Sequence, residues 1–465
     1  MTWFTTPRQR FVAGVLLVIA ALGGVVVFDR FFREEPAPYF QSDEDHFLYG
    51  SVGTEAAGVP YWIWLVLPRI FPEYLEPGGY ASIGILSRDG HEMPIGLSKA
   101  TVGVPRVGVN CAMCHSATFR ARPDDVPMIY PATAAHQATE QAYVRFLVAC
   151  ANDPRFTPDT ILGEIAKNTS LSLATRLQYR LFVIPNARRD ILRLQDDRTA
   201  TPIHPPYGDA SQSDSMPLWN LRRRDGTPFF RDGLNASLRE AVQWSATSEG
   251  TPAKWMDRDY AAWDSTVPTA MSSLRRVMNY IGDLKAPKYP LPIDAQLAAA
   301  GANTFDSTCA SCHKTGGPRA GSVIPWSEIG TDRTRLDLWT SAAAAAANGA
   351  GDAHPWKFSG FKKTDGYLAV PLDGVWLTAP YLHNGSVPTL ADLLEPVAAR
   401  PKQFWRGYDV YDSTRVGFIT AGAAAERTGD LFDIARPGHG NAGHTYGTQL
   451  APEQKRALLE YLKTL

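Results

Sequence analysis

The segment Cys309–His313, with the sequence CASCH, constrains this chain most strongly, together with an earlier copy, CAMCH, at Cys111–His115. Both copies read C-x-x-C-H, the pattern through which a c-type haem is attached to a protein. Two thiols in this spacing reach the two vinyl groups of one porphyrin, and the histidine that follows reaches the iron from one face. The sequence therefore predicts two covalently attached haem c groups. Their attachment residues and first iron ligands would be Cys111, Cys114 and His115 for one haem and Cys309, Cys312 and His313 for the other.

A zinc site built from two C-x-x-C pairs is the alternative interpretation of these cysteines. It does not explain why a histidine follows the second cysteine in both copies. The fifth cysteine, Cys150, ends an apolar run and is predicted to be a buried thiol in a helix. With the other four cysteines assigned to haem, no disulfide framework is expected.

An apolar run at residues 11–28 follows Arg8 and Arg10. As a helix it would extend about 27 Å, close to the thickness of a bilayer core. We interpret residues 1–35 as an N-terminal membrane anchor, with a cleaved signal peptide as the alternative. Because basic residues stay on the cytoplasmic side, the rest of the chain would face the periplasm of a bacterium from its inner membrane. The net charge of −1 gives no reason to expect a nucleic-acid partner.

The middle of the chain shows several helical patterns separated by segments rich in proline and glycine. The aromatic stretch Tyr61–Leu67 is expected in the core, and residues 90–110 and 199–217 are expected to be loops. Helices are expected at about 134–150, 160–194, 237–244 and 271–284, and the run Ala342–Ala347 is read as either helix or loop. The linker Ala286–Pro292 suggests a first haem domain at 36–285 and a second cytochrome c domain at 286–465.

Two helices define the second domain. Asp294 can cap a helix that reaches about Phe305, and Pro452 can open a terminal helix that reaches Leu462. A helix before the haem motif packed against a terminal helix is the arrangement of cytochrome c domains. The predicted fold class is therefore mainly α, with two cytochrome c-like haem domains and long loops, preceded by a transmembrane helix.

A six-coordinate haem needs a second axial ligand, usually a methionine or a histidine. The last methionine of the chain is Met278, so the second domain can offer only histidines. We favour His444, which lies in a glycine-rich loop just before the terminal helix. His383 is the next choice, although it also reads as a hydrogen-bonded turn residue. The remaining histidines of this domain are His354 and His439.

The first haem has more candidates for its second ligand, and none lies in a compelling sequence context. They are His91, Met93, Met128, His136, His204 and Met216. The sequence therefore permits an open sixth position, which in the ferrous state binds O2 and in the ferric state binds peroxide. Four arginines could pair with haem propionates or stabilise bound oxygen species, with a solvated side chain as the alternative for each: Arg222, Arg223, Arg224 and Arg231. Trp219 is a candidate electron relay between the haems, with core packing as the alternative.

The two motifs and the segment Pro371–Leu390 resemble the bacterial di-haem cytochrome c peroxidase superfamily. Finer features resemble one branch, the rubber-oxygenase-like di-haem cytochromes, from about Ser98 to Leu465. They lie at Leu218–Asn220, Arg231–Asn235, Arg406–Tyr411 and Gly443–Thr448. This resemblance implies an open, oxygen-binding N-terminal haem and a C-terminal haem with two histidine ligands, the second of them at His444. It also places Trp219 near both haems.

The chain departs from the classical peroxidases of that superfamily at three places. Arg231 stands where they have an aromatic residue that relays electrons. Ala241 and Thr251 stand near the places of their distal glutamine and glutamate, and Glu249 is close to the latter but displaced. Moving a proton between the oxygens of peroxide requires such a base. The resemblance therefore implies redox chemistry at haem but no particular substrate, and the rubber polymer is not carried over.

The main functional hypothesis is a membrane-anchored periplasmic di-haem cytochrome that acts as an oxidoreductase on peroxide or O2. Its first haem would be the open active site, its second the electron-transfer centre, and Trp219 and Arg231 would serve catalysis. The alternative is a pure electron-transfer cytochrome with both haems six-coordinate. Either protein would need a periplasmic or membrane electron donor or acceptor.

Overall fold

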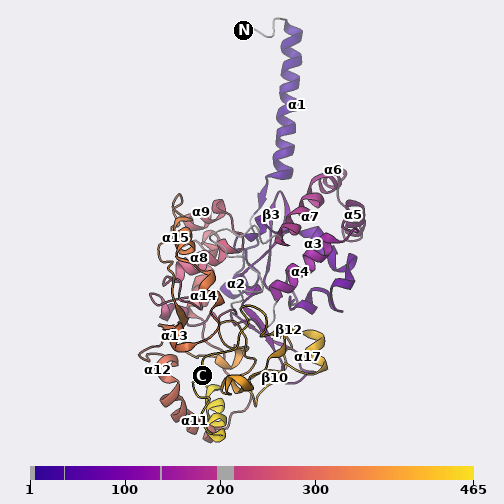
Figure 1. The fold of residues 1–465 in the computed structure, drawn as a ribbon. Coiled ribbons are helices and arrows are strands. Elements are labelled where there is room, and N and C mark those ends of the chain that lie inside the picture. The colour runs from indigo at the N-terminus through magenta and orange to yellow at the C-terminus, as the bar shows by residue number, and fades with distance from the viewer. Residues whose placement is uncertain (1–5, 36, 137–138, 196–213) are drawn as a thin grey trace.

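The computed structural model describes residues 6–35, 37–136, 139–195 and 214–465 (Figure 1). Helix α1 (Pro7–Phe31) projects from the rest of the molecule as a single rod. Within the described part of the chain, it is the one helix long and apolar enough to cross a membrane. The helix expected at residues 11–28 is therefore present, and its side chains are exposed rather than packed in a core.

A four-stranded antiparallel sheet lies next to the end of α1, in the order β1 (Glu34–Glu35), β3 (Leu97–Val102), β4 (Val104–Val109) and β2 (Val59–Pro60). The loop expected at residues 90–110 is thus wrong over β3 and β4. Gly103, with a φ of 70°, forms the tight turn between these strands, and the valines beside it favour extended backbone. Strand β4 leads directly into the first C-x-x-C-H motif, so the hairpin fixes where that motif begins.

One group of helices packs beside this sheet around an apolar core. Its members are α3 (Tyr61–Ile70), α4 (Thr139–Asn152), α5 (Pro158–Ile165), α6 (Leu173–Gln178) and α7 (Ile184–Leu192). The core contains most of Tyr61–Leu67 and the fully buried Cys150 on α4, as predicted. The continuous helix expected at 160–194 is wrong. The chain breaks after α5, and a π-helical turn at Tyr179–Val183 joins α6 to α7.

A second group of helices forms the other side of the molecule (Figure 1). It includes α2 (Asp43–Tyr49), α8 (Leu238–Ser248), α9 (Ala253–Ala261), α10 (Ser273–Asp283) and α15 (Ser341–Gly349). The helices expected near 237–244 and 271–284 are confirmed, and the alanine run lies in α15. In this core Trp244 packs on Phe361, with ring centroids 4.7 Å apart. The boundary proposed between residues 285 and 286 stays a prediction.

The C-terminal part is built on α11 (Ala295–Thr308) and α18 (Pro452–Leu462), which pack against each other as predicted. The Asp294 side chain caps α11 by accepting hydrogen bonds from the main-chain N–H groups of Gln296 and Leu297. Gly301 allows the close approach, because a Cβ atom there would lie 1.9 Å from the carbonyl oxygen of Ala457. One turn later the Phe305 side chain packs against α18. This helix pair holds the second C-x-x-C-H motif at the end of α11.

The remaining elements are short. Four small antiparallel pairs are β5 (Ser116–Phe119) with β6 (Met128–Pro131), β7 (Val323–Pro325) with β8 (Gly366–Leu368), β9 (Gln403–Arg406) with β12 (Asp430–Asp433), and β10 (Tyr411–Asp412) with β11 (Gly417–Phe418). The short helices are α12 (Ala310–His313), α13 (Trp326–Ile329), α14 (Thr334–Leu338), α16 (Leu390–Leu393) and α17 (Ala423–Thr428). Long loops connect them and contribute to the walls of the two cavities described next.

Candidate functional site: two cavities at the C-x-x-C-H motifs

The second motif lies at a cavity of about 320 Å³ with mainly apolar walls. Cys309, at the end of α11, and Cys312 and His313, on α12, line it from one side. The Nδ1 atom of His313 lies 2.7 Å from the carbonyl oxygen of Val370. A carbonyl can only accept, so Nδ1 carries the proton and Nε2 keeps its lone pair for a metal. This is the usual arrangement around a metal-binding histidine.

His444 lines the same cavity. Its ring centroid lies 6.1 Å from that of His313. Metal–imidazole bonds are about 2.0 Å long, and the bonded nitrogen lies about 1.1 Å from the ring centre, so two imidazoles on opposite sides of one metal have centroids roughly 6 Å apart. The spacing therefore suits one iron between the two rings.

Arg400 holds the loop that carries His444. Its buried guanidinium donates hydrogen bonds to the carbonyl oxygens of Asn441, Gly443 and His444, at 2.7, 2.9 and 3.1 Å. The main-chain N–H of His444 also donates to the carbonyl of Ile329, at 2.8 Å. Sequence analysis did not identify Arg400, because nothing in its local sequence links it to a loop some forty residues later.

The other histidines of this half of the chain differ in their surroundings. His383 lines the second cavity, but its ring stacks on Tyr367 with centroids 3.8 Å apart. Its ring nitrogen Nε2 is buried without a hydrogen-bond partner. As expected of a hydrogen-bonded turn residue, His383 lies in a turn, and its main-chain carbonyl accepts from the N–H of Asp214, at 2.8 Å. His354 pairs instead with the carboxylate of Asp257, and His439 lies 3.0 Å from a main-chain carbonyl. Neither of these two lines the cavity.

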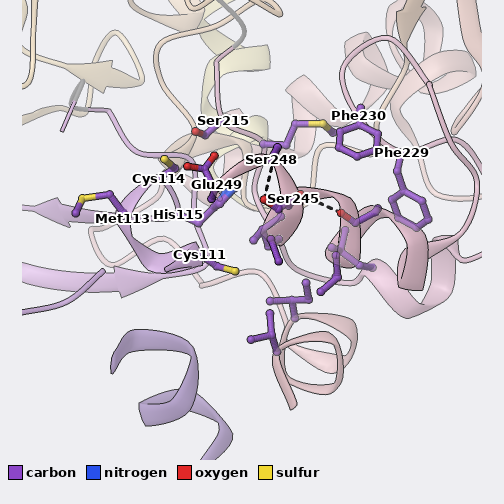
Figure 2. A pocket seen from close by; sticks show the side chains of 18 of the residues that line it. Cys111, Met113, Cys114, His115, Ser215, Phe229, Phe230, Ser245, Ser248 and Glu249 are labelled. Carbon is purple, nitrogen blue, oxygen red and sulfur yellow. Dashed lines mark hydrogen bonds between the residues drawn. The ribbon is translucent and has the colours of Figure 1, made fainter. Parts of the chain in front are cut away.

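The first motif lies at a separate cavity of about 290 Å³ (Figure 2). Cys111, Cys114 and His115 line it. The side chain of Asn110 fixes the start of the motif, because it accepts from the N–H of Ala112 and donates to the carbonyls of Leu48 and Gly50 at the end of α2. Burial lowers the pKa of His115 to about 4, which keeps the imidazole neutral and able to bind a metal.

The first cavity has a largely apolar wall contributed by the second group of helices and the segment before it. Members of this wall are Leu221, Phe229, Leu238, Val242, Val277 and Ile281. Among the described residues that line the cavity, His115 is the one imidazole. Of the six candidates for a second ligand, the described structure brings only Met216 to this cavity, and His204 lies outside the described residues.

The other four candidates of the first haem lie elsewhere. His91 stacks on Tyr49 with ring centroids 3.9 Å apart, and His136 stacks on Phe418 at 4.2 Å. Met93 belongs to the apolar core beside the sheet, and Met128 is exposed on β6. Packing therefore accounts for three of these four side chains.

Two carboxyl groups meet beside the first motif. The Cys114 sulfur lies 3.1 Å from an oxygen of Glu140, and Glu140 is hydrogen-bonded to Glu249. Both glutamates line the cavity; Glu140 is half-buried and Glu249 is exposed. Burial, together with the neighbouring Glu140, raises the pKa of Glu249 well above its ordinary value. Sequence analysis noted Glu249 only as displaced and missed Glu140.

Arg231 and Trp219 lie between the two cavities. Arg231 lines both and donates hydrogen bonds to the carbonyl oxygens of Asp214 and Ser215, at 3.0 and 2.8 Å. The buried indole of Trp219 donates to the carbonyl of Asp373, a residue of the second cavity, at 2.8 Å. The residue before Trp219 lines the first cavity. Arg231 is thus shared by both cavities, whereas Trp219 lines neither but is bonded to a residue of the second and adjoins a residue of the first.

The other three arginines divide by position. Arg224 lines the first cavity and donates to the carbonyl of Pro228, at 3.0 Å. Arg222 forms an ion pair with Asp283 at the surface, and Arg223 is exposed. Of the four arginines singled out in the sequence, Arg224 and Arg231 therefore face a cavity.

The arrangement of the cysteines argues against the zinc alternative. The two C-x-x-C pairs line different cavities, whereas a four-cysteine zinc site needs them together. Across the described ranges, no cluster of three or more His, Cys, Asp or Glu side chains is positioned to bind a bare ion. Burial raises the pKa of Cys111 to about 12 and that of Cys309 to about 11, so these thiols stay protonated. Thiols, imidazoles and apolar walls together suit a covalently bound porphyrin.

Comparison with known proteins agrees with this chemistry. The family described as RoxA-like, cytochrome c-like matches residues 366–406. This segment runs from β8 to β9 and contains Tyr367, Asp373, His383 and Arg400. Three of these residues line the second cavity. The match indicates a haem cytochrome and implies covalently bound haem c.

The chain is also 30% identical over 309 residues to the uncharacterised protein y4iM of Sinorhizobium fredii, covering 52% of this chain and 69% of y4iM. It belongs to the y4iM family. A second protein of that organism, the uncharacterised y4iJ, is 47% identical over 108 residues, which are 21% of this chain and 18% of y4iJ. The y4iM relationship thus extends over half of this chain, and the y4iJ relationship is confined to one segment.

Proposed function

We propose that this member of the y4iM family is a di-haem c-type cytochrome that acts as an oxidoreductase on peroxide or O2. The first cavity would be the site of reaction, and the second would hold the electron-transfer centre. One contrast supports this proposal. The second cavity presents two imidazoles with centroids 6.1 Å apart, whereas His115 is the one imidazole among the described residues that line the first.

Bound haem would supply the redox chemistry in each cavity, and the residues of the chain would provide its surroundings. His115 would hold the first iron, and the apolar wall would exclude water from the opposite face. Burial and the neighbouring Glu140 raise the pKa of Glu249 well above its ordinary value, which favours the protonated carboxyl group. Reduction of O2 or peroxide consumes protons, so this carboxyl group is suited to deliver one. The guanidinium of Arg231 would stabilise negative charge between the two cavities, including that of propionates.

Electrons would pass between the cavities through the wall that contains Trp219. Its indole is buried and is held toward the second cavity by the hydrogen bond to Asp373. A side chain that relays electrons between two haems needs a fixed position, and this hydrogen bond holds the indole in one.

The cellular setting is also part of the proposal. Helix α1 would cross the inner membrane of a bacterium, with Arg8 on the cytoplasmic side and the two cavities in the periplasm. That orientation suits covalent haem attachment, which takes place outside the inner membrane. A periplasmic or membrane-bound redox protein would donate or accept electrons.

Electron paramagnetic resonance of the ferric full-length protein in detergent, before and after addition of peroxide, tests the proposal. We expect one high-spin and one low-spin haem, with the high-spin signal changing on peroxide. In parallel, the reduced protein should show an absorbance change on exposure to O2. Two low-spin haems that are inert to both oxidants would contradict the enzyme.

One observation favours the alternative of a pure electron-transfer cytochrome. Met216 lines the first cavity, and a methionine thioether is a common sixth ligand of c-type haem. The same spectra decide between the two functions. If the first haem is low-spin in the native protein and becomes high-spin in Met216→Ala, the protein is an electron carrier.

A further inference from the structure

An exposed apolar stripe runs along α6 and the π-helical turn that follows it. Leu173, Leu177 and Leu181 are four residues apart and are 75%, 47% and 59% exposed, and the neighbouring Phe182 is 49% exposed. Residues spaced by four lie on one side of a helix. The opposite side of the π-helical turn is buried in the core through Tyr179 and Val183, and α6 itself buries Gln178. The stripe is therefore a second apolar face, which the fold leaves uncovered.

This stripe begins where α1 ends. The ring of Phe182 packs edge-on against Phe31, the last residue of α1, with centroids 5.4 Å apart. The Arg30 side chain donates a 2.6 Å hydrogen bond to the hydroxyl of Thr175, and the Gln178 side chain donates to the carbonyl oxygen of Arg30. Figure 1 shows α6 beside the base of α1, on the side of the molecule from which α1 projects. A membrane crossed by α1 would end at this level.

Basic side chains accompany the apolar ones. Arg176 and Arg180 are exposed between the leucines, and Arg189 and Arg193 are exposed farther along the same helical segment. Arg180 forms an ion pair with Asp159, and both Arg189 and Arg193 pair with Asp190, so the segment keeps an excess of basic charge. Leucine and phenylalanine on one face, with arginines beside them, is the composition of helices that lie in a membrane interface. Arginines at that level also attract anionic lipid headgroups.

We propose that residues 172–183 lie in the surface of the bilayer that α1 crosses, with the four apolar side chains entering the acyl region. The occupant of the stripe is then lipid, and the fold is held against the membrane at two places instead of swinging on α1 alone. This inference rests on the proposed anchoring by α1. It also fixes an orientation, because α11 and α12, which carry the second motif, lie at the opposite end of the molecule (Figure 1).

Photo-crosslinking of the full-length holoprotein in lipid nanodiscs tests the inference. The photoreactive residue p-benzoylphenylalanine replaces Leu177 in one variant, Leu17 of α1 in a second and Ala299 of α11 in a third. Leu17 is 71% exposed, and Ala299 is exposed at the end away from α1. The discs contain phosphatidylethanolamine and phosphatidylglycerol, and lipid adducts are counted by mass spectrometry. Unchanged haem spectra show that each variant is folded.

We expect lipid adducts at positions 17 and 177, with a yield at 177 about tenfold above that at 299, because an interfacial face touches acyl chains. Adducts at 17 without adducts at 177 would overturn the proposed contact between the stripe and lipid, while still supporting the anchoring by α1. Crosslinks from 177 to a second protein chain in place of lipid would also overturn it. Equal yields at 177 and 299 would show that labelling is non-specific and would refute the proposed contact with the bilayer. Absence of adducts at both 17 and 177 would refute the anchor as well.

Discussion

His313 and His444 place their imidazole rings 6.1 Å apart in one cavity, although they come from different parts of the chain. Each ring is held independently. The Nδ1 atom of His313 donates to the carbonyl of Val370, and the loop of His444 is bound by the guanidinium of Arg400. The ring spacing and the fixed His444 loop are what a haem with two histidine ligands would need in the second cavity.

The first prediction concerns the ligand itself. We expect His444→Ala to convert the second haem from low spin to high spin, because no methionine follows Met278 and none can take its place. Electron paramagnetic resonance of the ferric protein measures the change. His354→Ala is the matched control and should leave both spectra unaltered, since His354 pairs with Asp257 away from the cavity. A persistent low-spin signal in His444→Ala would redirect the assignment to His383.

The second prediction treats Arg400 as a positioning residue. Arg400→Gln leaves several buried carbonyls without a donor, each at a cost of about 1–3 kcal/mol. We expect a lower unfolding temperature and a mixture of high-spin and low-spin second haem, since the loop no longer holds His444 in place. Arg400→Lys should restore part of the low-spin fraction. Arg415→Gln, at a half-exposed arginine, is the control. A stability loss with a purely low-spin spectrum would reduce Arg400 to a structural role.

The third prediction concerns transfer between the haems. Trp219→Phe removes the indole N–H that donates to Asp373 and should slow electron transfer between the haems while both absorption spectra stay intact. Single-turnover reduction followed by stopped-flow absorbance measures the rate. Trp263→Phe changes a buried tryptophan that lines neither cavity, and serves as control. Equal rates in the two variants would count against the relay.

The features that could be predicted correctly have a signal in their local sequence, such as a helix cap, or follow from the position of one residue type along the chain. The cap at Asp294 and the proline at Pro452 mark helix starts, so the starts of both α11 and α18 are predicted correctly; α18 ends at Leu462 as expected, whereas α11 continues past Phe305 to Thr308. The position of Met278 made a histidine the expected ligand of the second haem, and the structure brings His444 to the ring of His313. That His444 binds iron remains a prediction.

What the sequence did not show depends on contacts between distant segments. The pairing of β3 with β4 was hidden because glycine, proline and valine together are also typical of loops. Arg400 and Glu140 gain their significance only from the loops and carboxyl groups that folding brings to them. Arg231 was chosen from its motif, but its contact with both cavities follows from tertiary structure alone.

The last prediction concerns Glu249 and pH. Its folded-state pKa is raised, so the folded protein retains a proton that the unfolded chain releases above the ordinary pKa of 4.5. Folding stability from this group is therefore greatest at low pH and is lost as pH rises from 4.5 toward the raised value. Glu249→Gln stays neutral at every pH, so its free energy of unfolding should fall less steeply than that of the wild type over this range. Urea unfolding of the holoprotein at several pH values measures the two slopes.

The control for this prediction is Glu164, whose pKa is shifted in the opposite direction. Hydrogen bonds from Lys167 and Arg69 lower the pKa of Glu164, so that group stabilises the fold above pH 4.5 and loses this effect as pH falls. Glu164→Gln should therefore alter only the acid side of the stability profile. If Glu249→Gln shows the same slope as the wild type above pH 4.5, the carboxyl group is ionised in the folded protein. It would then hold no proton for the reduction of O2 or peroxide, and delivery of that proton would fall to another group.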